Sequence, residues 1–110
     1  LIARNMPALN TLQVGALNFD LGQRRISIDG QPVQLNRTSE RVLEVLMRAY
    51  PNAVTRADLE FAVWGDSPPE SDTLRTHVPA IRKAIDEGAK HKMLRTIHRY
   101  GYQLIAESRQ

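Results

Sequence analysis

The sequence predicts an α+β fold in which a small antiparallel sheet comes first, three helices follow and a β-hairpin comes last. Three observations support this order. Apolar residues alternate with polar ones up to residue 35, recur at helical spacing up to residue 88, and alternate again from residue 93. A length of 110 residues fits one domain. We assign residues 11–108 to that domain and residues 1–10 to a linker.

The first strands are indicated by apolar side chains on short, alternating spacings. These residues are Leu12, Val14, Leu17 and Phe19, then Ile26 and Ile28, then Val33 and Leu35. Gly15 interrupts the first series, and the pair Asp29-Gly30 is typical of a tight hairpin turn. We therefore expect a small antiparallel sheet with one buried face.

Two helices follow, each with an apolar stripe at helical spacing. The stripes consist of Val42, Leu43, Leu46, Met47 and Tyr50 in the first helix, and Leu59, Ala62 and Val63 in the second. Asn36 and Thr38 are candidate N-caps for the first helix, which ends at Pro51. Thr55 is the expected N-cap of the second, because Asp58 follows three residues later as in a capping box.

The third helix is expected to begin at Ser71 or Asp72 and to end near Gly88. Its inner stripe consists of Leu74, Val78, Ile81 and Ile85. Pro79 lies within it and lacks an N–H group, so we expect it to kink the helix or to delay its start. Residues 93–98 and 102–105 then predict two strands, between which Gly101 permits a turn or bulge.

Positive charge is concentrated in the last third of the chain. Residues 1–70 carry 7 basic and 8 acidic side chains, whereas residues 71–110 carry 8 basic and 4 acidic ones. This asymmetry is expected of a face that binds a polyanion, although a solvated positive surface has the same composition. No apolar run approaches the roughly 20 residues that cross a bilayer. The chain also has no cysteine, so we expect a cytoplasmic protein with no membrane partner.

Enzyme chemistry is not indicated by any motif. The sequence has no glycine-rich phosphate loop, no cysteine nucleophile and no His-Glu-x-x-His pattern. The three histidines, His77, His91 and His98, are too scattered for a zinc site. We therefore expect no catalytic residue, no metal and no cofactor.

Three helices followed by a hairpin is the winged-helix plan, in which the third helix enters the DNA major groove and the hairpin contacts the backbone or minor groove. The outer face and flanks of the third helix carry Asp72, Arg75, Thr76, Ala80, Arg82 and Lys83. An ordinary solvated helix face fits these residues equally well. The hairpin favours DNA binding, because Arg95, His98 and Arg99 lie within five residues of one another.

From about Leu12 to Ile105 the chain resembles the C-terminal effector domain of OmpR/PhoB-type response regulators. The segments that carry the resemblance are Leu35–Ser39, Val54–Leu59, Val63–Gly65, Leu74–Lys83 and Leu94–Tyr102. The resemblance implies a winged helix-turn-helix with an N-terminal four-stranded antiparallel sheet. It also implies sequence-specific binding of double-stranded DNA, with transcription as the controlled process.

The resemblance and the helix faces together give a set of expected DNA-binding residues, namely Trp64, Arg75, Thr76, Arg82, Lys83, Thr96, His98 and Arg99. Trp64 can equally serve as a partly buried anchor. An RNA polymerase contact loop would include Asp66, Ser67 and Glu70. By the same resemblance, residues 1–10 are the remnant of an interdomain linker to a receiver domain. That domain would be phosphorylated by a sensor histidine kinase and would promote formation of a homodimer.

The chain departs from the family pattern at two places. Pro79-Ala80 stands where a polar or basic pair is usual, so base contacts there do not carry over. His98 stands where Arg is common and Arg99 where Gly is common, so we expect the wing cation to have moved by one position. The alternative function is a winged helix used for protein–protein contact, whose binding would not weaken steeply with salt.

Overall fold

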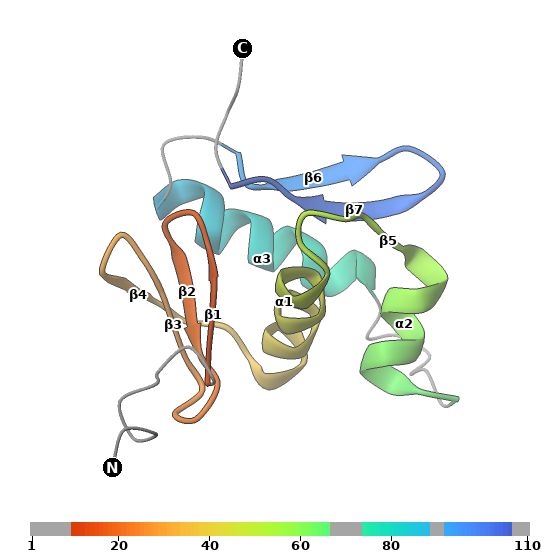
Figure 1. Ribbon diagram of the computed structural model, residues 1–110. Helices are drawn as coiled ribbons and strands as arrows, with labels where there is room; N and C mark the ends of the chain where they lie inside the picture. Colours follow the sequence, from red (N-terminus) through yellow and green to blue (C-terminus); the bar gives the residue numbers. More distant parts are fainter. Residues whose placement is uncertain (1–9, 67–73, 89–91, 107–110) are drawn as a thin grey trace.

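The computed structural model describes residues 10–66, 74–88 and 92–106. The elements are β1 (Thr11–Val14), β2 (Leu17–Asp20), β3 (Arg25–Ile28), β4 (Gln31–Val33), α1 (Arg37–Ala49), β5 (Val54–Thr55), α2 (Arg56–Trp64), α3 (Leu74–Gly88), β6 (Leu94–Ile97) and β7 (Gly101–Leu104) (Figure 1). The predicted α+β order is confirmed. The predicted start of the third helix at Ser71 or Asp72 lies outside the described residues.

The N-terminal sheet has the antiparallel order β1-β2-β3-β4. Its buried side chains fall on alternate positions, as the sequence pattern predicted: Val14, Leu17, Phe19, Ile26 and Ile28. The predicted turn between β3 and β4 is confirmed, because Asp29 and Gly30 have φ angles of 52° and 82°. Two positive φ angles at the central positions are those of a type I′ turn, which matches the twist of the strands it connects.

The C-terminal hairpin belongs to a three-stranded sheet of order β5-β7-β6, not to a two-stranded one. Strand β5 was not predicted, because two residues are too short for a period to be recognised. It pairs Val54 with Tyr102 and Thr55 with Gly101. Gly101 was expected to form a turn or bulge, and this is wrong. A Cβ at Gly101 would lie 2.8 Å from Thr55 Cα and would overlap the Val54 carbonyl oxygen, so glycine is needed there for close strand approach.

Of the two candidate caps of the first helix, Asn36 caps α1 and Thr38 lies inside it, and Thr55 caps α2 as predicted. The Asn36 side chain accepts a hydrogen bond from the Ser39 N–H at 2.8 Å, and Thr55 Oγ1 accepts one from the Asp58 N–H at 3.0 Å. Leu59 and Val63 of α2 are buried, but Ala62 is exposed, so its assignment to the inner stripe is wrong. Ala62 lies about 60° around the helix from Leu59, on the side away from Val63. It is therefore outside the face of α2 that packs on the core.

Helix α3 continues through Pro79, so the expected delay of its start beyond that residue is wrong. Only one helix hydrogen bond is lost, because Pro79 cannot donate to the Arg75 carbonyl. Both of these residues are exposed. The inner stripe is at most 3% exposed on either side of the proline (Leu74, Val78, Ile81 and Ile85). This packing keeps the segment helical despite the low helix propensity of proline.

Candidate nucleic-acid interface

The outer face of α3 is formed by small or cationic side chains. Its exposed members are Arg75, Thr76, Pro79, Ala80 and Lys83. They lie opposite the buried stripe that packs α3 on the core and on α1. The helix therefore presents the two distinct faces expected from the sequence. Among these five residues, the centre of the face carries only the small side chains of Thr76, Pro79 and Ala80, which permit close approach to a groove.

The wing tip is a tight turn that exposes His98 and Arg99. The Tyr100 N–H donates to the Ile97 carbonyl at 2.9 Å, which closes a four-residue turn from Ile97 to Tyr100. Arg99, the third residue of this turn, has a φ angle of 62°. A positive φ at that position alone is typical of a type II turn, which favours glycine there. The backbone at this position therefore favours glycine, and it places the Arg99 side chain at the tip.

A hydrogen bond joins α3 to the wing. Arg82 Nη2 of α3 donates to Thr96 Oγ1 of β6 at 2.6 Å. Asp86 strengthens the connection, because its Oδ1 accepts from the Met93 N–H at 2.8 Å and the Leu94 N–H at 3.4 Å. The outer face of α3 and the wing are therefore held as one surface. Arg82 and Thr96, which the sequence placed in the same site, lie in direct contact.

Trp64 lies at the end of α2 and is half-buried against the core. Its ring is 6.2 Å from that of His77, at an angle of 46°. His77 is only 2% exposed, and its Nδ1 is 2.9 Å from Ser39 Oγ. This geometry agrees with Trp64 as an anchor, and its DNA contact stays a prediction. Of the predicted polymerase loop, Asp66 is exposed, while Ser67 and Glu70 lie outside the described residues.

Arg56 was not among the predicted site residues, yet it borders both parts of the surface. It is exposed, and its N–H donates to the Tyr100 carbonyl at 3.0 Å. It lines a surface cavity of about 410 Å³ with wing residues Thr96, His98 and Arg99, and another of about 330 Å³ with Arg75. A hydrogen bond to Tyr102, which is 7% exposed, raises the pKa of Arg56.

A sequence feature could have identified Arg56. It directly follows the N-cap Thr55 and is the first residue of α2. The N–H groups and the dipole at a helix N-terminus favour a bound anion, and a cation beside them strengthens that preference. Tyr102 is buried, whereas Tyr100 is 50% exposed on the wing.

Other kinds of site were also sought over the described ranges. Within residues 10–66, 74–88 and 92–106, no three His, Asp or Glu side chains are grouped so that they could hold a metal ion. None of the helices in these ranges combines the length and apolar character needed to span a membrane.

Comparison with known proteins identifies the family. A family model described as "Transcriptional regulatory protein, C terminal" matches residues 30–104. The chain belongs to this family. The resemblance to OmpR/PhoB-type effector domains is therefore confirmed.

Relatives of this family member share about a third of its residues. It is 32% identical over 98 residues to the phosphate regulon transcriptional regulatory protein PhoB of Pseudomonas aeruginosa, a match that covers 88% of the chain and 42% of that protein. It is 33% identical over 95 residues to the sensory transduction protein RegX3 of Mycolicibacterium smegmatis, covering 84% of the chain and 42% of RegX3. The chain thus spans less than half the length of these relatives.

The fold is that of a winged-helix DNA-binding domain. The crystal structure of the DNA-binding domain of CpxR from E. coli superposes with a TM-score of 0.74 and 26% identity, covering 89% of this chain and 98% of that one. The predicted winged helix-turn-helix with a four-stranded N-terminal sheet is confirmed.

Proposed function

We propose that the chain is the output domain of a response regulator and controls transcription by sequence-specific binding of double-stranded DNA. Helix α3 would lie in the major groove and the wing in the minor groove. The observation that carries this proposal is the Arg82–Thr96 hydrogen bond, which makes the outer face of α3 and the wing a single surface. On the described part of the chain, no salt bridge involves Arg75, Lys83 or Arg99. Their charges are therefore available to phosphates.

Each part of the surface has a distinct role in this proposal. Arg75 and Lys83 neutralise phosphates on either side of the groove, whereas Thr76 and Ala80 face base edges and thymine methyl groups. At the wing, Arg99 enters the minor groove, where the negative potential is strongest, with His98 beside it. Trp64 packs near the DNA backbone, and Arg82 and Thr96 fix the angle between helix and wing.

Arg56 adds a phosphate contact between the two parts. It lies at the N-terminus of α2, where the helix dipole favours an anion, and it shares a cavity with Arg75. A hydrogen bond to Tyr102 raises the pKa of its guanidinium, which therefore stays charged. A DNA phosphate bound there would lie between the contacts made by α3 and those made by the wing.

The proposal is tested by titrating a duplex, selected from a random library, against the domain between about 50 and 200 mM salt. Affinity should fall steeply, and each phosphate contact removed should lower the log–log salt slope by about 0.9. Lys83→Ala and Arg99→Ala should each reduce affinity and slope. Arg41→Ala, an exposed change on α1, is the matched control and should change neither. If both site variants bind as the wild type does at low salt, the proposed surface is wrong.

Arg56→Gln tests the added contact with the same assay. It should reduce the slope by about 0.9 while leaving the order of preferred duplex sequences unchanged, because a phosphate contact carries no sequence information. A changed sequence preference with an unchanged slope would contradict this role.

Partners in the whole protein are part of the proposal. Relatives of about twice this length support a receiver domain joined through residues 1–10, a sensor histidine kinase acting on it, and a homodimer on repeated DNA sites in the cytoplasm. Asp66, Ser67 and Glu70 are proposed to contact RNA polymerase.

One observation favours the alternative function, a protein-contact module: Phe61 on α2 is 64% exposed. Phe61→Ser should leave duplex binding unchanged whichever function is right. If the substitution abolishes binding of a protein partner, the protein-contact module is favoured.

A further inference from the structure

The centre of the outer face of α3 is formed by three short side chains, Thr76, Pro79 and Ala80. They recur at i, i+3 and i+4, so they lie on one side of the helix, opposite its buried stripe. All three are exposed, so none of them is fixed by the packing of the core. This centre therefore offers one hydroxyl group and otherwise only methyl and methylene groups to whatever approaches the helix.

Pro79 is a costly residue at this position. It cannot donate a hydrogen bond to the Arg75 carbonyl, and its ring crowds that carbonyl. Its side chain is exposed, so no burial of apolar area within the domain offsets this loss. A residue that weakens its own helix without packing on the core is expected where a partner uses its shape. The apolar pair Pro79-Ala80 thus points outward, to the groove that α3 would enter.

Side chains that read bases by paired hydrogen bonds are missing from the centre of this face. Adenine is read in this way by Asn or Gln, and guanine by Arg or Lys. Helix α3 contains no Asn or Gln between Leu74 and Gly88. Its cations lie to the sides: Arg75 lines a cavity beside the N-terminus of α2, and Arg82 donates to Thr96 Oγ1 at 2.6 Å. Lys83 lies almost one turn beyond the apolar pair.

The apolar group that the major groove presents is the C5-methyl group of thymine. Small side chains let the helix approach closely enough to cover this methyl group, and burial of one such group changes affinity about 4-fold. From Thr76 to Ala80 the helix rises about 6 Å. Since successive base pairs are about 3.4 Å apart, this centre covers about two base-pair steps.

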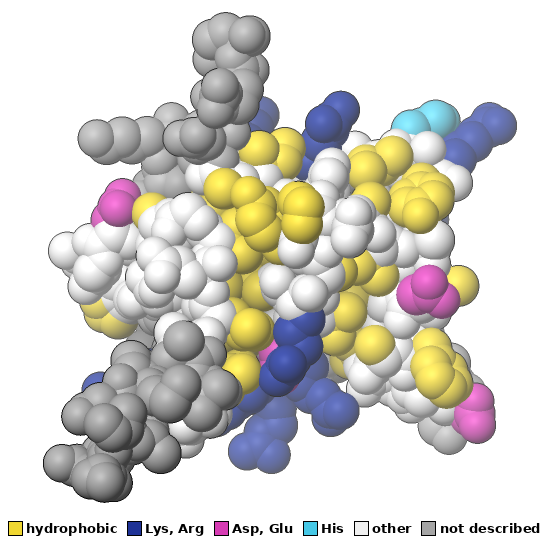
Figure 2. Space-filling view, viewed as in Figure 1, with side chains coloured by type: hydrophobic (Ala, Val, Ile, Leu, Met, Phe, Trp, Pro, Cys, Tyr) yellow, Lys and Arg dark blue, Asp and Glu magenta, His cyan; other side chains and the backbone are white. Residues whose placement is uncertain are grey.

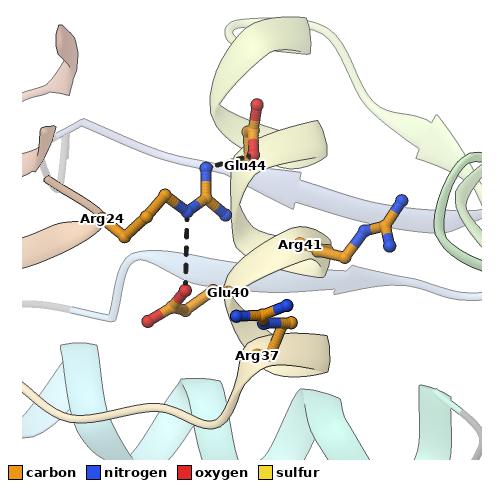
Figure 3. A pocket seen from close by; sticks show the side chains of 5 residues that line it. All are labelled: Arg24, Arg37, Glu40, Arg41 and Glu44. Atoms are coloured by element: carbon orange, nitrogen blue, oxygen red, sulfur yellow. Dashed lines mark hydrogen bonds and ion pairs between the residues drawn. The ribbon is translucent and has the colours of Figure 1, made fainter. Parts of the chain in front are cut away.

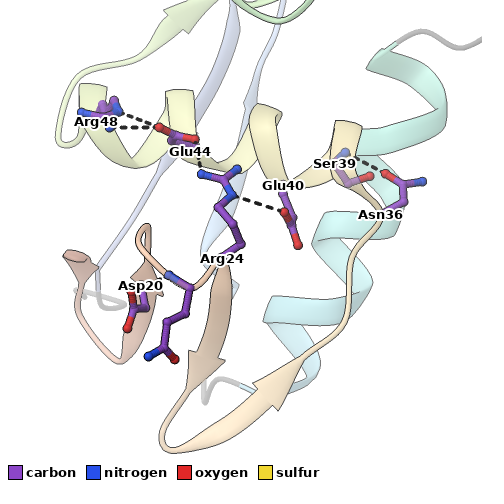
Figure 4. A network of polar contacts seen from close by, with 8 residues as sticks. Asp20, Arg24, Asn36, Ser39, Glu40, Glu44 and Arg48 are labelled. Carbon is purple, nitrogen blue, oxygen red and sulfur yellow. Dashed lines mark hydrogen bonds and ion pairs between the residues drawn. The ribbon is translucent and has the colours of Figure 1, made fainter. Parts of the chain in front are cut away.

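The other group of exposed cations is not suited to supply a base preference. It lies between α1 and the β2–β3 loop, where Arg24, Arg37 and Arg41 surround a cavity of about 620 Å³ together with Glu40 and Glu44 (Figure 3). Arg24 Nη1 donates to Glu44 Oε1 at 3.0 Å, and its Nε lies 3.7 Å from Glu40 Oε1 (Figure 4). In Figure 2 Lys and Arg gather at the lower centre, apart from those on the wing at the upper right. Because these carboxylates would repel DNA phosphates, base recognition is left to α3 and the wing.

We propose that α3 recognises its DNA by covering the C5-methyl groups of pyrimidines at about two neighbouring base pairs, rather than by paired hydrogen bonds to base edges. This inference rests on the proposed function, which places α3 in the major groove, and it names the chemical group that is read there. Thymine carries this group, and 5-methylcytosine carries the same group on a base pair with different hydrogen-bonding groups. The two bases therefore separate recognition of the methyl group from hydrogen bonding.

The first test changes the DNA and leaves the protein intact. A duplex selected from a random library is titrated at low salt, and its thymines are replaced one at a time by uracil, which removes only the C5-methyl group. Neighbouring thymines under α3 should each lose about 4-fold in affinity. Where cytosine replaces these thymines, 5-methylcytosine should bind about 4-fold more tightly than unmethylated cytosine. Contacts of the wing in the minor groove are unaffected, because the methyl group lies in the major groove.

The second test changes the protein at Ala80. Ala80→Gln adds an amide that can pair with adenine, and it holds the helix away from the methyl group. The ratio of thymine to uracil affinity should fall close to 1 at one of the sensitive positions. Ala62→Gln makes the same chemical change at an exposed position of α2 and is the matched control. It should keep the ratio of the wild type.

The outcomes separate this inference from the proposed function. Equal binding of thymine and uracil duplexes at every position, or of cytosine and 5-methylcytosine at the sensitive ones, would overturn methyl recognition while DNA binding stands. A thymine preference that Ala80→Gln leaves unchanged, or that Ala62→Gln abolishes equally, would also overturn it, because the methyl groups would then be read elsewhere. Failure of the wild type to bind any duplex would refute the proposed function itself.

Discussion

Gly101→Ala is the substitution for which the structure gives the sharpest expectation. The added methyl group would lie 2.8 Å from Thr55 Cα and would overlap the Val54 carbonyl oxygen, both of which are backbone atoms that cannot move independently. Relief requires β5 and β7 to separate, which breaks the Thr55–Gly101 pairing and moves the wing away from α2. Overpacking of this kind costs about 3 kcal/mol. For a domain of this size that lowers the melting temperature by about 12 °C.

Thermal unfolding followed by circular dichroism measures this effect. Gly22→Ala is the matched control, because a Cβ there has its nearest neighbour, Asp20 Oδ1, at 3.5 Å, an ordinary contact. The control should melt within about 2 °C of the wild type, since surface changes of this kind alter stability by at most about 0.5 kcal/mol. If Gly101→Ala melts as the control does, the close approach of β5 and β7 is not what requires glycine.

Three further predictions concern the wing, the core and the ion pairs that Glu44 makes with Arg24 and Arg48. Arg99→Gly should keep or raise the free energy of unfolding by about 0.5 kcal/mol, because glycine accepts a positive φ, while duplex affinity falls; a loss of both would refute the strain argument. Ser39→Ala should lower stability by about 2 kcal/mol in urea unfolding, because it removes a buried hydrogen bond to His77; no change would contradict this. The pKa of Glu44 is lowered in the folded state, so the stabilisation by its ion pairs is present above the unfolded pKa and is lost as pH falls through the lowered value. Glu44→Gln should therefore flatten the acid side of a profile of unfolding free energy against pH. An unchanged profile would show that the ion pairs of Glu44 do not stabilise the fold.

The features that could be predicted from the sequence are those set by local chemistry. Alternating apolar residues and the Asp29-Gly30 turn specify the first sheet, and Asn36 and Thr55 cap their helices as their side chains allow. Strand β5 could not be found, because its two residues become a strand only by pairing with β7. The delayed start of the third helix that Pro79 suggested is also wrong, since the buried stripe of α3 outweighs the loss of one hydrogen bond.

The candidate site was predicted residue by residue but not as a surface. Exposure of Arg75, Thr76 and Lys83 follows from helical periodicity. The Arg82–Thr96 hydrogen bond joins residues 14 positions apart and depends on how the hairpin packs on α3. Arg56 likewise comes beside the wing because its N–H donates to the Tyr100 carbonyl, far along the chain. Periodicity specifies which side of an element is outward, but not which outward residues of different elements become neighbours.

Arg99 in the wing turn is a residue whose backbone conformation disfavours its side chain, and this mismatch bears on its function. Arg99 occupies a left-handed position where glycine would be free of steric cost, and an L-residue pays about 1 to 2 kcal/mol there. A strained residue is expected to persist where its side chain is needed, and the Arg99 side chain is exposed at the tip, where it has no role in packing. Under the proposed function, Pro79 and Ala80 supply no side-chain hydrogen bond to the bases at the centre of α3, and we expect a cation at the wing tip to compensate by strengthening the second DNA contact. The strain at Arg99 and the apolar centre of α3 would then both follow from a wing that provides more of the DNA contact and a helix that provides less.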